Sequence, residues 1–430
     1  MAFDSEEIRK RQQRRRQEAQ RRQERQRQLR KRIIIGLIAA AVILALCGLV
    51  ILLLQHTAQP SPTEPSANET TLPVQTQPTE PETVIHLAFG GDLNVTDKVV
   101  ASGVSGDGYD YTDVFMDIVP LFAGVDAAAL NFEGNLCGAP YGTQNARAPQ
   151  ALMEALSAAG VDMIQMANSC TINNGLLGLR STLDGIRAAG MEPLGAYATP
   201  EEFEKSKGFT LRSIHGVKVA FVAFTKGVSS MGLPEGSEDC VNLLYTDYTS
   251  TYQKVDTEGI TEILEAVELE KPDVTIAMLH WGSEYNGQIS GTQEQIVKLM
   301  QKNGVDAIIG THSHYVQTID YDEATGALVA YSLGDFYGDA DKNGTNYSIV
   351  LNLEITKNNL TGQTKITEYE CTPIYTMTQE KDGVGTTRIL RIRDAIASFE
   401  ANSIDKVSEE TYNAMKAALK KIEARVEPQE

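Results

Sequence analysis

Apolar and polar positions alternate along residues 84–327 in a pattern that predicts strands followed by helices. Short apolar runs, typical of buried strands, end near residues 92, 133, 167, 224, 279 and 310. Amphipathic stretches between them predict helices over 149–160, 178–189, 257–269 and 292–303. This repeated strand–helix order predicts an α/β fold with a largely parallel sheet and helices on both of its faces.

The pattern changes after Ala327. Three apolar runs, 328–336, 347–355 and 364–377, are separated only by turns that contain Gly or Asn. Runs connected in this way are expected to pair as antiparallel strands. The segment 387–426 has a helical pattern of mixed charge, so we expect one or two appended helices there.

An uncharged run of 22 residues, Ile33–Leu54, is long enough to cross the roughly 30 Å hydrocarbon core of a membrane as a helix. Thirteen Lys or Arg residues precede it in residues 1–32, against five acidic residues. By the positive-inside rule this predicts a single-pass signal-anchor in the cell membrane, with a cytoplasmic N-terminus and an extracellular C-terminal domain. A cleaved signal peptide is the alternative, but no A-x-A site follows the run.

The segments on either side of this run are polar. The basic arm 1–32 is expected to be a charged helix near anionic lipid headgroups, with a short coiled coil as the alternative. Its place beside a membrane makes lipid the expected anion and argues against nucleic acid as a partner. Residues 55–83 are rich in Pro, Thr, Ser, Glu and Gln without apolar periodicity, so we expect a disordered, extended stalk.

Charge and cysteine content add two constraints. The formal net charge is −19, and because the arm carries an excess of eight positive charges, the rest of the chain carries −27. Four cysteines follow the stalk, with no CxxC pair: Cys137, Cys170, Cys240 and Cys371. One or two disulfides can form outside the cell, but their pairing is left open by the spacing.

Acidic and imidazole side chains follow several of the predicted strands. Asp92, Glu133 and His280 each close an apolar run, and His312 and His314 follow the run that ends at residue 310. The carboxyl ends of parallel strands form the crevice where open α/β folds bind ligands. Carboxylates and imidazoles bind first-row divalent ions, and a two-metal site needs a bridging carboxylate. We therefore predict a metal site; the alternatives are loop histidines at 312 and 314 and an ordinary buried histidine at 280.

These residues also carry a resemblance to a known family. The segments GGDLN (90–94), NFEG (131–134), HWGSEY (280–285), GTHSH (310–314) and YSLGDF (331–336) stand in the order and spacing of the CapA family of capsule synthesis, or poly-γ-glutamate biosynthesis, proteins. The resemblance covers about residues 84–375, which we assign to one domain, with 376–430 as a C-terminal helical extension. It implies a fold similar to calcineurin-like metallophosphoesterases, a two-sheet sandwich flanked by helices, preceded here by the transmembrane helix.

The resemblance also implies roles for individual residues. Asp92, Glu133, His280, His312 and His314 match the metal positions of the family, for a divalent ion such as Mn, Zn or Fe. Glu284 and Tyr285 are expected to orient His280 from behind, and Asn168 to support the ligands. Trp281 fits equally a cleft wall or a core aromatic.

One departure from the family pattern bears on activity. Where the family has Asn-Asn-His, in which an asparagine binds a metal and the histidine acts as general acid, this chain has Asn168, Ser169 and Cys170. Ser169 is a weak neutral ligand, and Cys170 is a poor proton donor near neutral pH. Asp335 replaces a family asparagine and adds a carboxylate near the site. We therefore expect weak or absent hydrolysis.

Two functions fit this sequence. The first is a metal-dependent hydrolase, phosphoesterase-like, that acts outside the membrane on a cell-envelope or capsule polymer. The second is a non-catalytic protein that binds an anionic polymer such as poly-γ-glutamate, or other membrane subunits of capsule synthesis. A body of charge −27 repels a polyanion, which favours contact at a metal or at a local basic patch.

Overall fold

The computed structural model describes residues 81–229, 231–338, 342–381, 384–403 and 407–426. Residues 77–430 make up one compact unit. The predicted basic arm, coiled coil, membrane span and nearly all of the stalk lie outside the described residues. Across the described ranges, every helix is too short or too polar to span a membrane.

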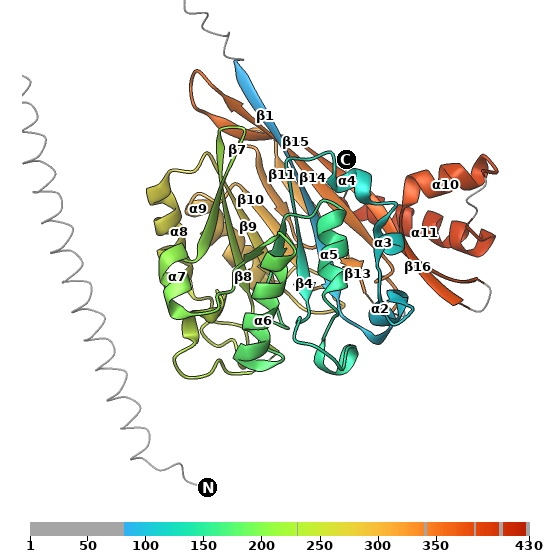
Figure 1. Cartoon of the computed structure of the whole chain (residues 1–430). Coiled ribbons are helices and arrows are strands. Elements are labelled where there is room, and N and C mark those ends of the chain that lie inside the picture. Colours follow the sequence, from blue (N-terminus) through green and yellow to red (C-terminus); the bar gives the residue numbers. More distant parts are fainter. Residues whose placement is uncertain (1–80, 230, 339–341, 382–383, 404–406, 427–430) are drawn as a thin grey trace, which may run out of the picture. The chain divides into compact units, whose positions relative to one another are not determined.

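Two sheets form the centre of the compact unit (Figure 1). The eight-stranded sheet contains β1 (Glu82–Asn94), β4 (Ala127–Glu133), β5 (Met163–Gln165), β6 (Glu192–Leu194), β13 (Asp335–Tyr337), β14 (Tyr347–Asn358), β15 (Thr364–Lys381) and β16 (Val384–Arg391). The six-stranded sheet contains β7 (Phe209–Ile214), β8 (Val217–Thr225), β9 (Val274–His280), β10 (Ala307–Thr311), β11 (Ile319–Asp322) and β12 (Ala327–Ala330). A small hairpin pairs β2 (Val104–Ser105) with β3 (Gly108–Tyr109).

Both sheets are mixed. The larger has the order β16-β15-β14-β1-β4-β5-β6, with β13 beside β1, and the smaller has the order β11-β12-β10-β9-β8-β7. The parallel strands are β1, β4, β5, β6 and β13 in one sheet and β8, β9, β10 and β12 in the other. Antiparallel strands extend the edges, so the carboxyl ends of all parallel strands remain available for a site.

The helices lie in the connections between strands up to β10, except the last two, which follow β16. They are α2 (Asp97–Ser102), α3 (Thr112–Phe115), α4 (Val119–Phe122), α5 (Ala151–Ala158), α6 (Gly175–Ala188), α7 (Pro200–Ser206), α8 (Thr257–Glu270), α9 (Gly291–Lys302), α10 (Ile392–Glu400) and α11 (Glu409–Val426), with 3-10 turns η1 (Thr143–Asn145) and η2 (Glu238–Cys240). Local sequence sets some of their ends. Asp256 caps α8, and Ser290 with Gln293 forms a capping box that starts α9.

Alternate residues of β8 face two different hydrophobic clusters. Val219 and Phe221 belong to a cluster that includes residues of β1, β4 and β14 from the other sheet. Ala220 and Val222 instead pack in a cluster with residues of α8 and α9. The nearly continuous apolar run of β8 is therefore buried on both faces, by the other sheet on one side and by helices on the other.

An aspartate stands directly before each of four parallel strands. Asp126, Asp162, Asp273 and Asp306 precede β4, β5, β9 and β10. Each carboxylate accepts a hydrogen bond of 2.7–2.8 Å from a backbone amide of the neighbouring strand, donated in turn by His86, Ala128, Lys218 and Thr275. These bonds satisfy amides at the amino ends of the strands and help to set the strand register there.

Much of the predicted secondary structure is confirmed. The helices expected over 149–160, 178–189, 257–269 and 292–303 correspond to α5, α6, α8 and α9. The antiparallel pairing of 347–355 with 364–377 is confirmed by β14 and β15. The α/β class is confirmed as well, with two mixed sheets and helices.

Three predictions are wrong. The largely parallel pairing expected from the strand–helix pattern is wrong, because both sheets are mixed, whereas the two sheets implied by the family resemblance are present. The run 328–336 does not join the antiparallel strands, because the chain passes from one sheet to the other within it: β12 pairs in parallel with β10, and β13 with β1. Residues 376–391, assigned to the helical extension, complete β15 and form β16, and the helices begin only at Ile392, because pairing with β15 holds β16 extended.

The four cysteines that follow the stalk are free thiols. Cys240 is buried and the other three are half-buried. The compact unit is therefore held together by its hydrophobic clusters and hydrogen bonds.

Asp162→Ala is expected to lower the free energy of unfolding of residues 77–430 by about 1–3 kcal/mol, because the amide of Ala128 loses its partner. Urea denaturation followed by circular dichroism measures this change. Asp162→Asn is the control, since its amide oxygen can still accept the hydrogen bond, and it should cost less than half as much. Equal losses for both variants would contradict a role for this hydrogen bond.

Candidate metal centre

The carboxyl end of β1 carries the central acid of the site. Asp92 is fully buried, and in the eight-stranded sheet it lies between Asn131 of β4 and Asp335 of β13. Two residues further along β1, Asn94 pairs with Glu133 at the end of β4. Because alternate strand residues point to the same face, these side chains gather on one side of the sheet. This edge therefore presents three carboxylates.

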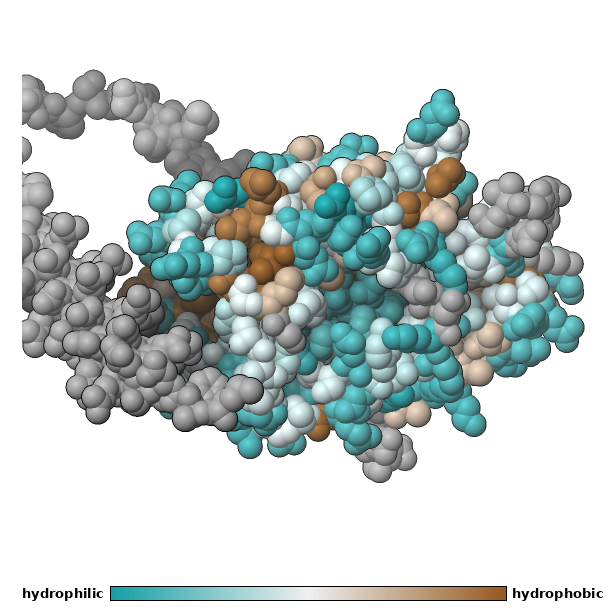
Figure 2. Space-filling view, turned by 90° about the horizontal axis from the view of Figure 1, so that it is seen from below, coloured by the Kyte–Doolittle hydropathy of each residue, from teal (hydrophilic) through white to brown (hydrophobic). Residues whose placement is uncertain are grey.

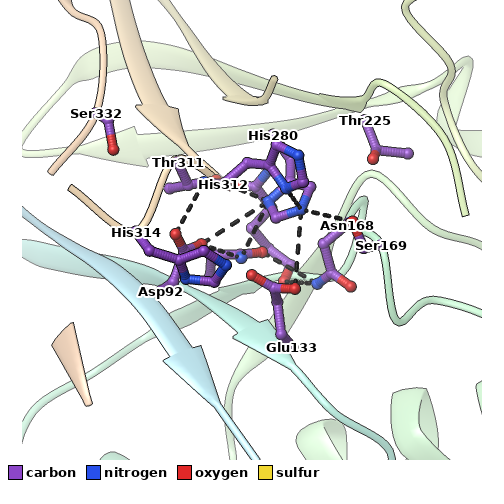
Figure 3. Close-up of polar contacts among 12 residues, drawn as sticks. Asp92, Glu133, Asn168, Ser169, Thr225, His280, Thr311, His312, His314 and Ser332 are labelled. Atoms are coloured by element: carbon purple, nitrogen blue, oxygen red, sulfur yellow. Dashed lines mark hydrogen bonds and ion pairs between the residues drawn. The ribbon is translucent and has the colours of Figure 1, made fainter. Parts of the chain in front are cut away.

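The six-stranded sheet supplies the imidazoles. His280 is the last residue of β9 and pairs in register with Thr225 of β8 and Thr311 of β10. His312 and His314, just after β10, have φ angles of 89° and 59°, a left-handed backbone that is uncommon outside glycine. This turn directs both rings toward His280 and the carboxylates (Figure 3).

The carboxylates and imidazoles form two groups that share one residue (Figure 3). Ligand atoms of Asp92, Glu133 and His280 all lie within 4.8 Å of one another, and so do those of Asp92, His314 and Asp335. The structure thus gathers all the residues that the sequence named as ligands, at positions 92, 133, 280, 312 and 314, and adds Asp335. Their role as metal ligands stays a prediction.

Hydrogen bonds hold the central carboxylate between the two sheets. Asp92 Oδ1 accepts a bond of 2.6 Å from the Asn131 side chain, and its Oδ2 accepts one of 2.8 Å from the His312 amide. Asn131 is held in turn by Asn168, whose side-chain amide donates to its Oδ1 at 3.0 Å. Asn168 therefore contacts the candidate ligand Asp92 only through Asn131.

The imidazoles are held by one another and by polar neighbours. His280 Nδ1 lies 3.0 Å from Thr311 Oγ1, and its Nε2 lies 3.0 Å from His312 Nδ1. His314 Nδ1 lies 2.7 Å from Asp335 Oδ1. Each ring therefore has a defined orientation, as metal-binding histidines require.

Burial shifts the protonation of these groups. It raises the pKa of Asp92 to about 6, although His314 opposes the shift. Burial, with the Asp92 carboxylate beside it, raises the pKa of Glu133 well above its usual range. Burial also holds the pKa of His280 and His312 well below the usual value, so both rings are neutral and keep a lone pair for a metal.

His314 behaves differently. Burial lowers its pKa, but the carboxylates of Asp335, Glu133 and Asp92 outweigh burial and raise the pKa to about 11. The protonated ring places one positive charge beside three buried acidic side chains. A divalent ion would supply positive charge here and release the proton of His314.

Glu133 has a buried oxygen, Oε1, without a hydrogen-bond partner. Its Oε2 lies 3.9 Å from His280 Nε2. An unpaired buried carboxylate oxygen is costly and calls for an explanation such as an ion. The donor set of carboxylates and neutral imidazoles fits a divalent first-row metal, and Asp92, which is common to both groups, would be a ligand in either.

The segment that departs from the family pattern lies beside these groups. Ser169 Oγ is 3.1 Å from His280 Nε2, so position 169 faces the candidate ligands. The side chain of Asn168 already has hydrogen-bond partners. Its Oδ1 accepts a hydrogen bond from the Cys170 amide, and its side-chain nitrogen donates to the backbone carbonyl of Phe132 and to Asn131 Oδ1. Burial raises the pKa of the Cys170 thiol well above its ordinary value, so the thiol holds its proton.

The structure places the residues expected to orient His280 elsewhere. Tyr285, which has a positive φ of 53°, stacks on His314 with ring centroids 4.7 Å apart. Glu284 is exposed, and no hydrogen bond joins it to His280 in the described chain. Trp281 is a core aromatic: it is fully buried and donates a hydrogen bond of 2.9 Å to a backbone carbonyl.

Three polar residues of the site escaped the sequence analysis. Asn131 contacts Asp92, Asn94 donates to Asp335 Oδ1 at 2.9 Å, and Thr311 contacts His280. A signal for two of them exists, because Asn94 and Asn131 stand two positions from Asp92 and Glu133, on the same strand face. Thr311 offers no such signal, since its contact depends on pairing between β9 and β10.

The site opens on the face formed by the carboxyl ends of the strands. Figure 2 views the molecule from that side and shows mostly hydrophilic residues around a hollow near the middle. Asp92 and His280 are fully buried, whereas Glu133 and His314 each keep 7% exposure. A ligand would therefore approach the site past Glu133 and His314.

Asp92→Asn is expected to abolish the stabilisation of residues 77–430 by manganese or zinc, because Asp92 belongs to both ligand groups. In the wild type, metal at 100 times its Kd should add about 2.7 kcal/mol to the free energy of unfolding. Thermal unfolding with and without metal measures the effect, with Glu294→Gln on the exposed side of α9 as a charge-matched control. A metal-induced Tm shift that survives Asp92→Asn would show that the centre is not built on this residue.

Comparison with known proteins places this geometry in context. The family model described as "Bacterial capsule synthesis protein PGA_cap" matches residues 86–340, which is more than half of the chain. "PGA biosynthesis protein CapA" from Bacillus subtilis (strain 168) is 22% identical over 343 residues, or 75% of this chain and 84% of that protein. "Capsule biosynthesis protein CapA" from Bacillus anthracis is 26% identical over 194 residues, or 45% of this chain and only 44% of that relative.

Solved structures with a similar arrangement include phosphoesterases. The calcineurin-like phosphoesterase YfkN from Bacillus subtilis is 16% identical with a TM-score of 0.40, covering 80% of this chain and 98% of that chain. A putative 5'-nucleotidase from Staphylococcus aureus is 12% identical with a TM-score of 0.43, covering 79% of this chain and 58% of that chain. The family model spans all the candidate ligands, and this chain belongs to the PGA_cap family of bacterial capsule synthesis proteins, as its motifs predicted.

Proposed function

We propose that this chain acts in the synthesis or export of a capsule polymer such as poly-γ-glutamate, through a divalent metal centre that binds anionic groups. The observation that carries the proposal is the pair of ligand groups sharing Asp92, together with the unpaired Glu133 Oε1. Membership of the capsule synthesis family supports the process. One relative, moreover, is named a PGA biosynthesis protein.

The chain's own side chains would define such a centre. Residues 92, 133, 280, 314 and 335 would hold the ion, and His312 lies against His280. Bound Mn, Zn or Fe would polarise an oxygen of an anionic group or lower the pKa of a water molecule. Tyr285 covers His314, and Lys342 Nζ lies 3.5 Å from the centre of the Tyr285 ring, so positive charge stands at the entrance.

Positions 169 and 170 favour binding over hydrolysis. Ser169 contacts His280 as a neutral hydroxyl, and the Cys170 thiol, with its raised pKa, is a weak acid. Loss of a general acid typically removes about 10²–10⁴ in rate. The non-catalytic function, a polymer-binding or assembly subunit, is therefore the better supported of the two, with slow metal-dependent hydrolysis as the second.

The native chain should hydrolyse bis(p-nitrophenyl) phosphate near the background rate in manganese. Ser169→Asn combined with Cys170→His should raise the rate by roughly 10²-fold, because a metal ligand and a proton donor are restored. Release of p-nitrophenolate measures the rate, and adding Asp92→Asn to the double variant should remove the gain. Rapid manganese-dependent turnover by the native chain would overturn the preference for binding.

We also propose that residues 33–54 anchor the chain in the cell membrane, with residues 77–430 outside the cell. The support is the uncharged run of 22 residues with its Lys and Arg excess on the N-terminal side. This location would bring the unit to an anionic envelope or capsule polymer and to other membrane subunits of capsule synthesis.

Protease added to intact protoplasts should digest the compact unit and spare an epitope tag at the N-terminus. Immunoblots against the tag and the unit give the readout, and permeabilised protoplasts serve as the control in which both are digested. A compact unit that resists protease until permeabilisation would place it on the inner side and contradict the proposal.

A further inference from the structure

A second charged site lies at the other end of the strands. A groove of about 530 Å³ is lined by residues of β7, β8 and β14, by the turn between β7 and β8, and by the segment before β9. Asp273 of this lining directly precedes β9, whereas His280 of the metal centre is the last residue of β9. About 20 Å of extended strand therefore separates the groove from the metal centre.

The groove is basic in an acidic protein. Four cationic side chains, Arg212, Lys218, Lys271 and Lys357, line it together with one carboxylate, Asp273. The net charge of the chain is −19, and −27 beyond residue 32. The groove therefore reverses the sign of the charge locally, which is what an anionic ligand requires of such a protein.

Two of the four cations have acidic partners. Lys357 Nζ lies 2.7 Å from Asp273 Oδ2, and Lys218 Nζ lies 3.7 Å from Glu270 Oε2. Arg212 and Lys271 form no ion pair within the part of the chain that the structure describes. These two side chains are therefore available to a ligand.

Arg212 also holds a buried nitrogen, Nη1, without a hydrogen-bond partner. Among the described residues, the only other charged group with such an atom is Glu133 of the candidate metal centre. A buried charged group without a partner is destabilising unless a ligand satisfies it. Arg212 therefore has hydrogen-bonding capacity that the described residues leave unused, in a residue that lines the groove.

We propose that this groove binds carboxylates of an acidic polymer, with the Arg212 guanidinium on one carboxylate and Lys271 on a neighbouring one. The planar guanidinium matches a carboxylate with two parallel hydrogen bonds. Leu211 is the one large apolar residue of the lining, whereas docking onto a lipid surface calls for several. The choice of poly-γ-glutamate as the polymer rests on the proposed function. The assignment of an anion-binding groove rests on its lining residues alone.

The test uses residues 77–430, a compact unit with its own hydrophobic clusters, in EDTA so that a metal does not contribute. Fluorescently labelled poly-γ-glutamate is titrated, and anisotropy gives the Kd. The wild type should bind saturably, and binding should weaken as salt is added. Arg212→Gln with Lys271→Gln should raise the Kd by at least about tenfold.

The control is a second pair with the same change of charge. Lys298→Gln with Lys420→Gln alters two exposed lysines of α9 and α11 that do not line the groove, and should change the Kd by less than about twofold. Unchanged Tm values would show that both pairs fold. Equal weakening by the two pairs would mean general charge attraction and would overturn the proposal.

Two further arms separate other anions from the polymer. In the first arm, phosphatidylglycerol vesicles replace the polymer. If Arg212→Gln with Lys271→Gln weakens binding to the vesicles and leaves binding to the polymer unchanged, the groove binds lipid and the proposal is overturned. Binding of inorganic phosphate that depends on Arg212 and Lys271, with no measurable polymer binding, would also overturn it. Because EDTA is present throughout, a failure of the metal centre leaves these outcomes unchanged, and the two proposals can fail separately.

Discussion

The buried carboxylate of Asp92 is the interaction on which the site depends. One of its oxygens accepts a hydrogen bond from Asn131 of its own sheet. The other accepts one from the backbone amide of His312, the residue directly after β10 of the second sheet. Directly before it, a Cβ on Gly91 would overlap the carbonyl oxygen of Gly334, so only glycine allows β1 and the chain before β13 to approach so closely. This approach places Asp92 beside Asp335, and the hydrogen bond from His312 joins Asp92 to the other sheet.

Charge is arranged in opposite senses at the two ends of the same strands. The carboxyl ends collect Asp92, Glu133 and Asp335 with two neutral imidazoles and leave one buried carboxylate oxygen unpaired. The amino ends collect lysines and leave one buried guanidinium nitrogen of Arg212 unpaired. An acidic protein can contact a polyanion only where its own charge is neutralised or reversed, and the two proposals concern these two places.

Different parts of the fold position the candidate ligands and the two residues at 169 and 170. The candidate ligands can therefore keep their positions when residues 169 and 170 differ. The ligands stand at strand ends, where register and burial hold them. Positions 169 and 170 lie in the turn after β5, where Ser169 keeps contact with His280 while Cys170 holds its proton. A change in that turn can therefore alter positions 169 and 170 and leave the carboxylates and imidazoles at the strand ends in place.

The sequence by itself determined the order of strands and helices, the family and the candidate ligands at strand ends, because each of these depends on a local pattern of apolar runs and the residues that follow them. Only the tertiary structure decided that residues 328–336 divide between two sheets, that β16 is a strand and that Tyr285 covers His314. It alone also brought Arg212 and Lys271 into one groove. Each of these features arises from contacts between residues far apart in the chain, and the periodicity of a local segment carries no information about which distant segment it will meet.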